Sequence, residues 1–166
     1  MGAAGRTGRA SGGRAHRGGG PRSLGAAVPV LALACAVAAC GPSRARMLEG
    51  EIRQAVQTAP GRIDLGQLYP AAWDRVCVLL PGTTAAGADS VLGFHFAGAQ
   101  YLVSRPDVTG LLFLRGQDAL VAMRYPRRDG DFAAAGRGYC RSRAAALLHV
   151  AGRSPAGGPA LVPLGP

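Results

Sequence analysis

The sequence predicts an α+β fold: a small antiparallel sheet with one or two helices, preceded by a signal peptide and followed by a disordered tail. Two observations favour this class. Apolar runs of strand length alternate with turn residues over residues 62–151, and the expected elements follow one another as strand, strand, helix, hairpin and strand. This range is long enough for one hydrophobic core.

Composition limits the class of protein. The chain has 166 residues, which predicts one modest domain, and its 26 glycines and 12 prolines indicate that part of it is unstructured. These values argue against a large multidomain enzyme, a coiled coil and a polytopic membrane protein. All 19 basic residues are arginines, as is typical of a GC-rich genome, so the formal net charge of +10 is weak evidence for a polyanion. We expect no nucleic-acid partner.

The N-terminal segment has the pattern of an export signal. Residues 1–23 contain five arginines, no acidic residue and almost no large apolar side chain, so we expect them to be disordered. Residues 24–40 then form an uncharged apolar run that ends in small residues. A basic segment, a short apolar segment and small residues at its C-terminal end are typical of a secretory signal peptide.

The end of this apolar run carries the most specific motif of the chain, Val37-Ala38-Ala39-Cys40. It resembles the lipobox of bacterial lipoproteins, which implies that Cys40 is lipidated, with palmitate among its acyl groups, and becomes the N-terminal residue. The membrane is then a partner through this lipid anchor, because two or three acyl chains hold a protein stably on a bilayer. Cys35 is a poorer candidate, since the apolar run before it is shorter.

Other interpretations of the N-terminal segment stay open. Residues 24–41 are about as long as the shortest bilayer-spanning helices, so they could be an uncleaved anchor. Alternatively, the signal is cleaved and Cys40 is incidental. The lipoprotein, the anchor and the cleaved signal all place the rest of the chain outside the cytoplasmic membrane, and a cytoplasmic protein is the remaining alternative.

The first expected elements follow the signal. Residues 41–61 are a tether or a short helix, because apolar residues recur at helical spacing before a Pro-Gly pair. A short strand is expected over residues 62–65. Residues 73–80 form an apolar, β-branched run closed by a second Pro-Gly pair, which predicts a buried strand with Trp73 as a core anchor.

The remaining expected elements are a helix, a hairpin and a last strand. Thr83 or Thr84 as N-cap and Gly93 as left-handed C-cap predict a short helix between them. Residues 110–125 form two apolar runs around a three-residue loop with glycine and aspartate, which predicts a β-hairpin. A final strand is expected over residues 144–150, although three consecutive alanines there also permit a helix. The Gly- and Pro-rich residues 152–166 are expected to be a disordered tail.

Short motifs in these elements resemble one group of proteins. Trp73-Asp74 before a strand, Leu92-Gly93-Phe94 at a helix end and Gly130-Asp131-Phe132 after the hairpin are similar to sequences of small uncharacterised bacterial lipoproteins. The resemblance covers roughly residues 63–150. It departs from the group at Gly82, where the group tends to have an aromatic residue, and it implies no activity.

Residues for catalysis or metal binding form no known motif. His95 and His149 lie far apart in the sequence, and neither belongs to a zinc or nucleophile motif. Ser104 with one of them and an acid would form a catalytic triad only by chance. We therefore expect no catalytic residue, no metal and no cofactor; a small membrane-tethered hydrolase or carbohydrate-active domain is the alternative.

The densest cluster of charge follows the hairpin. Arg124, Arg127 and Arg128 form a possible binding turn that could hold an anionic group such as a lipid phosphate or a cell-wall carboxylate. Alternatively, these arginines pair with Asp129 and Asp131 in a solvated turn, where such pairs contribute about 0–1 kcal/mol. The sequence favours the solvated turn.

Two cysteines remain for the exported domain. Cys77 lies within an expected buried strand, and Cys140 follows a Gly-rich loop. An oxidising compartment favours a disulfide between them, and two buried free thiols are the alternative. The sequence thus predicts an exported, lipid-anchored protein of a bacterial envelope. Its expected role is that of a non-enzymatic binding or structural module whose partner is an envelope protein or a cell-wall component.

Overall fold

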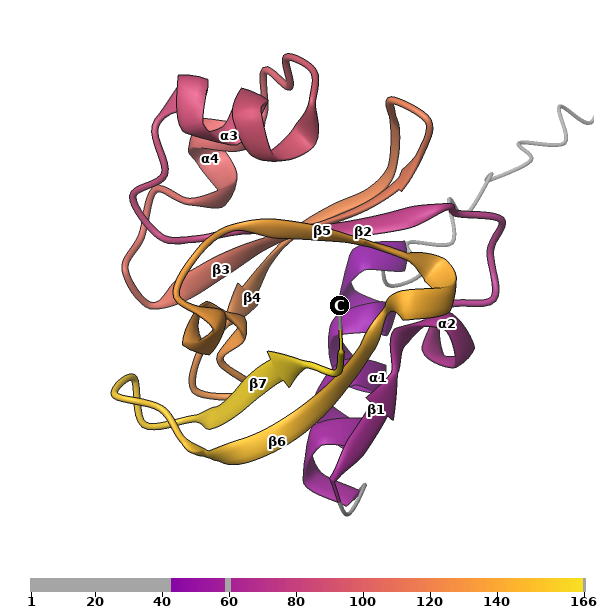
Figure 1. Ribbon diagram of the computed structural model, residues 1–166, viewed down its shortest axis with the longest axis vertical. Coiled ribbons are helices and arrows are strands. Elements are labelled where there is room, and N and C mark those ends of the chain that lie inside the picture. Colours follow the sequence, from indigo (N-terminus) through magenta and orange to yellow (C-terminus); the bar gives the residue numbers. More distant parts are fainter. Residues whose placement is uncertain (1–42, 59–60, 166) are drawn as a thin grey trace, which may run out of the picture. The chain divides into compact units, whose positions relative to one another are not determined.

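The computed structural model describes residues 43–58 and 61–165 (Figure 1). The predicted signal peptide and Cys40 lie outside the described residues. Within these ranges the fold is α+β, as predicted, and no helix is long and apolar enough to cross a membrane. In chain order the elements are α1 (Arg44–Thr58), β1 (Arg62–Asp64), α2 (Leu65–Leu68), β2 (Arg75–Leu79), α3 (Ala85–Leu92), α4 (Ala99–Leu102), β3 (Val108–Arg115), β4 (Asp118–Pro126), η1 (Phe132–Ala135), β5 (Tyr139–Ser142), η2 (Arg143–Ala145), β6 (Leu147–Arg153) and β7 (Pro159–Pro163).

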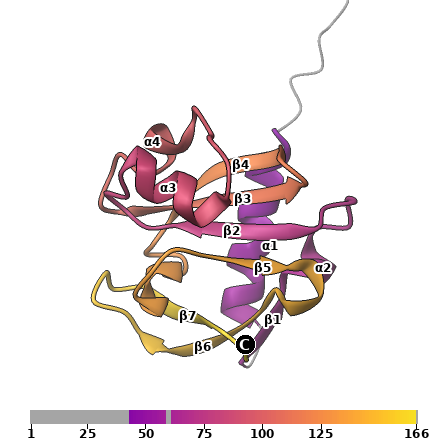
Figure 2. The same ribbon diagram turned by 45° about the horizontal axis from the view of Figure 1, so that its top comes forward.

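The strands form two small antiparallel sheets in the described part of the chain, where the sequence predicted one. The four-stranded sheet has the order β4-β3-β2-β5, and the three-stranded sheet has the order β1-β6-β7. Figure 2 shows the four-stranded sheet between α3 and α4 on one side and the three-stranded sheet on the other. The chain passes between the sheets twice, through α2 from β1 to β2 and through η2 from β5 to β6.

The central strands β2 and β3 are buried on both faces, which explains their uninterrupted apolar sequences. Side chains alternate between the two faces of a strand. Val76 and Val78 of β2 therefore contact the main core below the sheet, whereas Cys77 and Leu79 contact a second core beneath α3 and α4. Burial on both faces removes the polar alternation that marks a half-exposed strand.

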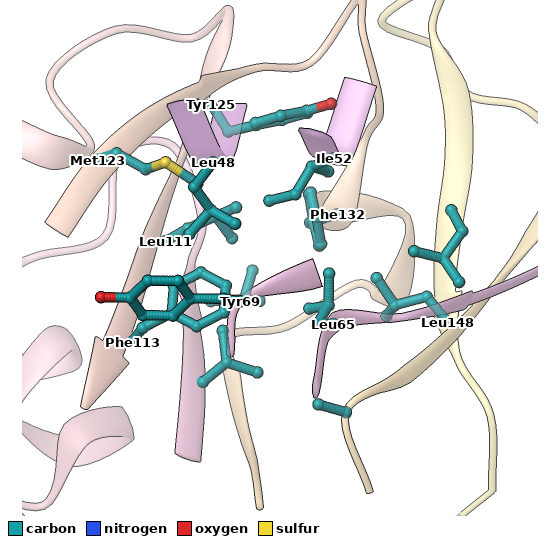
Figure 3. Packing of buried hydrophobic residues seen from close by; sticks show 14 of the residues in the cluster. Leu48, Ile52, Leu65, Tyr69, Leu111, Phe113, Met123, Tyr125, Phe132 and Leu148 are labelled. Atoms are coloured by element: carbon teal, nitrogen blue, oxygen red, sulfur yellow. The ribbon is translucent and has the colours of Figure 1, made fainter. Parts of the chain in front are cut away.

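Helix α1 belongs to the folded domain and is not a tether. Its residues Leu48, Ile52 and Val56 recur at helical spacing and are buried in the main core. Figure 3 shows Leu48 and Ile52 close to the rings of Tyr125, on β4, and Phe132, at the start of η1. The boundary predicted at residue 62 was therefore too late, because the helix supplies one wall of the core.

The predicted caps of α3 are confirmed. The Thr84 side-chain oxygen accepts a hydrogen bond from the Gly87 amide at 3.1 Å. Gly93 ends the helix at φ +78°, a left-handed conformation that glycine adopts without steric cost. Trp73 is also the predicted core anchor: it is 4% exposed, and its indole N–H donates to the Tyr69 carbonyl at 2.8 Å.

The predicted disordered tail is wrong, because residues 159–163 form strand β7 against β6. Glycine and proline here encode a hairpin. Gly157 takes φ +85° in the turn, and Pro159 and Pro163 stand at the two ends of an edge strand, where a missing N–H is tolerated. Ala160 and Leu161 between them are buried.

Candidate functional site

A cleft of about 620 Å³ lies where β3 begins and β4 ends. It brings together all three arginines of the predicted binding turn and adds Arg105, which the sequence did not indicate. Asp107 is the one acidic side chain among the residues that line it. The lining residues are Arg105, Pro106, Asp107, Val108, Arg124, Pro126, Arg127, Arg128 and Ala156.

Strand pairing explains why these segments meet. Val108 at the start of β3 lies opposite Pro126 at the end of β4, so the loop before β3 faces the turn after β4. The Arg127 amide donates to the Asp107 carbonyl at 2.9 Å and extends the ladder by one bond. The turn between β6 and β7 contributes Ala156 as a further wall.

Arg127 is held by a buried carboxylate. Its Nε and Nη2 donate to the two oxygens of Asp131, each at 2.9 Å, and Nη1 donates to the Pro106 carbonyl at 3.0 Å. Asp131 is 1% exposed and also accepts from the Ala133 amide at 3.0 Å. Arg127 thus joins three chain segments. It pairs with Asp131, as the solvated-turn interpretation expected, but the carboxylate of the pair is buried and not solvated.

The charge of Asp131 is stabilised where it is buried. Burial by itself raises the pKa of its carboxyl, but the Arg127 guanidinium, the Ser154 hydroxyl and the Ala133 amide lower it more, so the net pKa lies below the ordinary value. Asp131 is therefore a carboxylate at neutral pH, and Arg127 has a fixed counter-charge.

Arg124 is oriented by an exposed aromatic ring. Its guanidinium lies 4.2 Å from the centre of the Tyr101 ring, and Nη2 donates to the Tyr101 hydroxyl at 2.8 Å. Tyr101 itself is 63% exposed. A cation over a ring face and a hydrogen bond to the same side chain restrict the arginine rotamers, while Nε and Nη1 have no partner in the described residues.

Arg128 is the most accessible arginine of the turn. Its side chain is 82% exposed, and its nearest carboxylate oxygen in the described residues, on Asp129, lies 3.8 Å from Nε, beyond hydrogen-bond distance. Asp129 also faces Arg53 of α1, with 3.6 Å between the charged atoms. Arg128 can therefore form hydrogen bonds with a ligand.

Arg105 and Asp107 form an exposed pair at the edge of the cleft, joined by hydrogen bonds of 2.9 and 2.6 Å. The Arg105 hydrogen bond lowers the pKa of Asp107. Four arginines line the cleft, and two of them are bonded to carboxylates, Arg105 to Asp107 and Arg127 to Asp131, which leaves two positive charges at the cleft. Behind the turn, Asp129 faces Arg53 of α1, and Glu49 of the same helix lies close enough to act on the Tyr125 hydroxyl.

Buried aromatic side chains pack beneath the arginine turn. Tyr125 is fully buried, and its ring meets Phe132 edge to face at 5.4 Å (Figure 3). Burial raises the pKa of Tyr125, which keeps the hydroxyl protonated as a donor to the Asp129 carbonyl at 3.4 Å. Gly158 lies against the backbone of the turn, where an added Cβ would overlap the carbonyl oxygens of Arg127 and Arg128.

The residues considered for catalysis lie in separate places. His149 is on β6 in the three-stranded sheet, whereas His95 follows α3 on the far side of the other sheet and contacts Asp89 at 3.0 Å. The Ser104 hydroxyl donates to the Tyr101 carbonyl, not to a histidine. Within the described ranges, no group of three His, Cys, Asp or Glu side chains could hold a metal ion.

Cys77 and Cys140 form the predicted disulfide. They lie directly opposite each other in the β2–β5 pair, with 4.0 Å between their Cα atoms. The bond closes a loop with a sequence separation of 63 residues, which contains α3, α4, the β3–β4 hairpin and the arginine turn. The disulfide therefore fastens the segment that carries the cleft to the central strand.

Comparisons with protein-family models, curated proteins and solved structures found no match. The resemblance to small bacterial lipoproteins stays a prediction, and the function is inferred from the cleft itself.

Proposed function

We propose that the protein is a lipid-anchored envelope protein whose domain binds an anionic group of another envelope component in the arginine-lined cleft. Two features support the location. The motif that ends in Cys40 resembles a lipobox, and a disulfide between Cys77 and Cys140 suits an oxidising compartment outside the cytoplasm.

The cleft is the observation that carries the binding role. Its volume of about 620 Å³ is typical of sites for small ligands or for one segment of a larger ligand. Its two uncompensated positive charges favour an anion. Arg124 and Arg128 retain N–H donors that no described residue occupies, so a ligand can form charge-assisted hydrogen bonds with them.

A tethered hydrolase or carbohydrate-active domain has less support. A hydrolase needs a nucleophile or an activated water beside an acid or base. The lining residues of the cleft include no histidine, serine or cysteine, and their one carboxylate is already bonded to Arg105.

Palmitate labelling tests the anchor. Wild-type protein should incorporate the label and partition into the detergent phase, whereas Cys40→Ala should do neither and should accumulate as precursor. Cys35→Ala is the matched control and should be labelled like the wild type. Equal labelling of the Cys40 variant would contradict the lipid anchor.

Ligand-induced stabilisation tests the cleft, because a ligand that binds only the folded state raises the melting temperature. We expect inorganic phosphate and citrate to raise it for the wild type and for Arg115→Ala, an exposed arginine at the far end of β3. The double variant Arg124→Ala/Arg128→Ala should lose this response. An equal rise in all three proteins would show that binding does not involve the cleft.

A further inference from the structure

The separation of roles among the four arginines determines what the cleft can hold. Arg127 is committed to Asp131 and Pro106, and Arg105 is committed to Asp107. Arg124 and Arg128 therefore supply the available donors. Both line the same cleft, Arg124 from strand β4 and Arg128 from the turn that follows it.

Two guanidinium groups, each of which presents two parallel N–H donors as a fork, suit a ligand group with more than two oxygens. A single bidentate fork uses both oxygens of a carboxylate. A phosphate monoester carries three terminal oxygens and close to two negative charges at neutral pH, so it can accept from two forks at once. Its charge also matches the two uncompensated positive charges of the cleft.

The rest of the cleft indicates what kind of molecule carries the phosphate group. At about 620 Å³ the cleft is larger than a phosphate group needs, and Pro106, Val108, Pro126 and Ala156 give it apolar walls. The Tyr101 ring is not among the residues that line the cleft, but it stands beside Arg124, which covers one of its faces, and its 63% exposure leaves the rest of the ring for contact with a carrier larger than the phosphate. A ring-shaped polar carrier such as a sugar fits both features.

A bilayer surface fits less well. Tyr101 is the one exposed large apolar side chain near this cleft, since the other in the described residues is Met47 on α1. The donors line a concave site, whereas lipid headgroups form a flat layer.

We propose that the cleft binds a phosphate monoester carried on a sugar, with Arg124 and Arg128 as the contacting residues and Tyr101 as the positioning residue for Arg124. This inference rests on the proposed function and specifies its ligand class. Arg127 orders the turn and does not form the principal contact.

Calorimetric titration of the full, detergent-solubilised protein tests the ligand class. Glucose 6-phosphate should bind at least about tenfold more tightly than glucuronate, which carries one carboxylate on a similar ring. Equal affinity would overturn the inference and leave the proposed anion-binding function in place. If neither probe binds, and phosphate and citrate fail as well, both proposals are wrong.

The pH dependence gives an independent readout. The second ionisation of a phosphate monoester lies near pH 6. Affinity for glucose 6-phosphate should therefore fall about fourfold between pH 7.5 and pH 5.5, as the dianion fraction falls. The charged groups at the site and on the elements packed against it are arginines 53, 105, 124, 127 and 128, aspartates 107, 129 and 131, and Glu49 of α1, with no histidine among them. An unchanged affinity would contradict recognition of the dianion.

Conservative variants separate fork geometry from charge alone. Arg128→Lys keeps the charge but loses the fork and should weaken glucose 6-phosphate about tenfold, while Arg115→Lys should have no effect. Tyr101→Phe keeps the ring but loses the hydrogen bond to Arg124, and should weaken binding about threefold at unchanged melting temperature. Full affinity in both Arg128→Lys and Tyr101→Phe would overturn the assignment.

A vesicle experiment identifies the source of the phosphate. The lipidated protein is anchored in phosphatidylcholine vesicles with or without phosphatidic acid, which also carries a phosphate monoester. We expect the same affinity for glucose 6-phosphate in both. If phosphatidic acid displaces the sugar phosphate, the cleft takes a lipid headgroup and the sugar assignment is wrong.

Discussion

Arg127 and Asp131 form a two-point ion pair beneath the cleft, with both nitrogen–oxygen distances at 2.9 Å and the carboxylate 1% exposed. The pair lies four residues apart in sequence and crosses the turn that carries Arg128. The ordered conformation of the cleft and the stability of the domain therefore both depend on this ion pair.

Arg127→Ala should therefore destabilise the protein. The substitution leaves a buried carboxylate without its partner, which costs 3–5 kcal/mol for a fully buried pair and about 2–3 kcal/mol here, since Arg127 is partly exposed. Arg128→Ala is the matched control, and we expect a change below about 0.5 kcal/mol at this exposed position. Urea unfolding measures both. Similar stability of the two variants would contradict the structural role of Arg127.

The same pair predicts a pH dependence of stability. The folded-state pKa of Asp131 is lowered, so its contribution is fully present above the unfolded-state pKa of about 4 and is lost as pH falls through the lower folded-state value. Asp131→Asn should be less stable than wild type at pH 7 and should approach it near pH 3. Unfolding free energies at pH 7, 5 and 3 provide the measurement. A constant difference would show that the charge of Asp131 is not responsible.

Removal of the disulfide should lower stability strongly. For a loop of this length the chain-entropy relation gives about 4 kcal/mol as an upper value for Cys77→Ala/Cys140→Ala. A reducing agent should lower the melting temperature of wild type but not that of the double variant. Alkylation under denaturing, non-reducing conditions should leave both cysteines unmodified in wild type, and modification of both would disprove the bond.

Gly158→Ala should disturb the cleft wall. The new methyl group would overlap backbone carbonyl oxygens of Arg127 and Arg128, which cannot move without displacing the turn, so we expect a loss of about 2 kcal/mol or more. Gly50→Ala is the control within α1, where the methyl group meets nothing within 4 Å and should stabilise the helix by about 0.5–1 kcal/mol. Thermal unfolding of both variants distinguishes the two effects, and equal shifts would contradict the close approach at Gly158.

Local signals in the sequence predicted local structure well. The ends of α3 at Thr84 and Gly93 could be predicted because each depends only on residues nearby in the sequence. Thr84 accepts a hydrogen bond from the first turn of the helix, and Gly93 adopts a left-handed φ. The β3–β4 hairpin is likewise encoded by two apolar runs and a glycine turn, although its loop has two residues where three were predicted. The strand predicted over residues 144–150 is β6, which begins at Leu147 and continues to Arg153.

The features that the sequence did not predict depend on long-range pairing. Strand β5 has no apolar alternation of its own and is recognised only through its pairing with β2. Arg105 enters the cleft because β3 pairs with β4, which no local pattern reports. The burial of Asp131 beneath the β6–β7 turn likewise depends on residues that a Gly- and Pro-rich composition suggested were unstructured.

The position of the disulfide has a consequence for proteolysis. Nearly all of the cleft, including the exposed loop at Arg105 and Pro106 and the turn at Arg128, lies between Cys77 and Cys140. A single peptide-bond cut in either exposed segment would therefore leave two fragments that remain covalently joined through β2 and β5. In a compartment that contains proteases, the nicked protein would keep both walls of the cleft on one molecule.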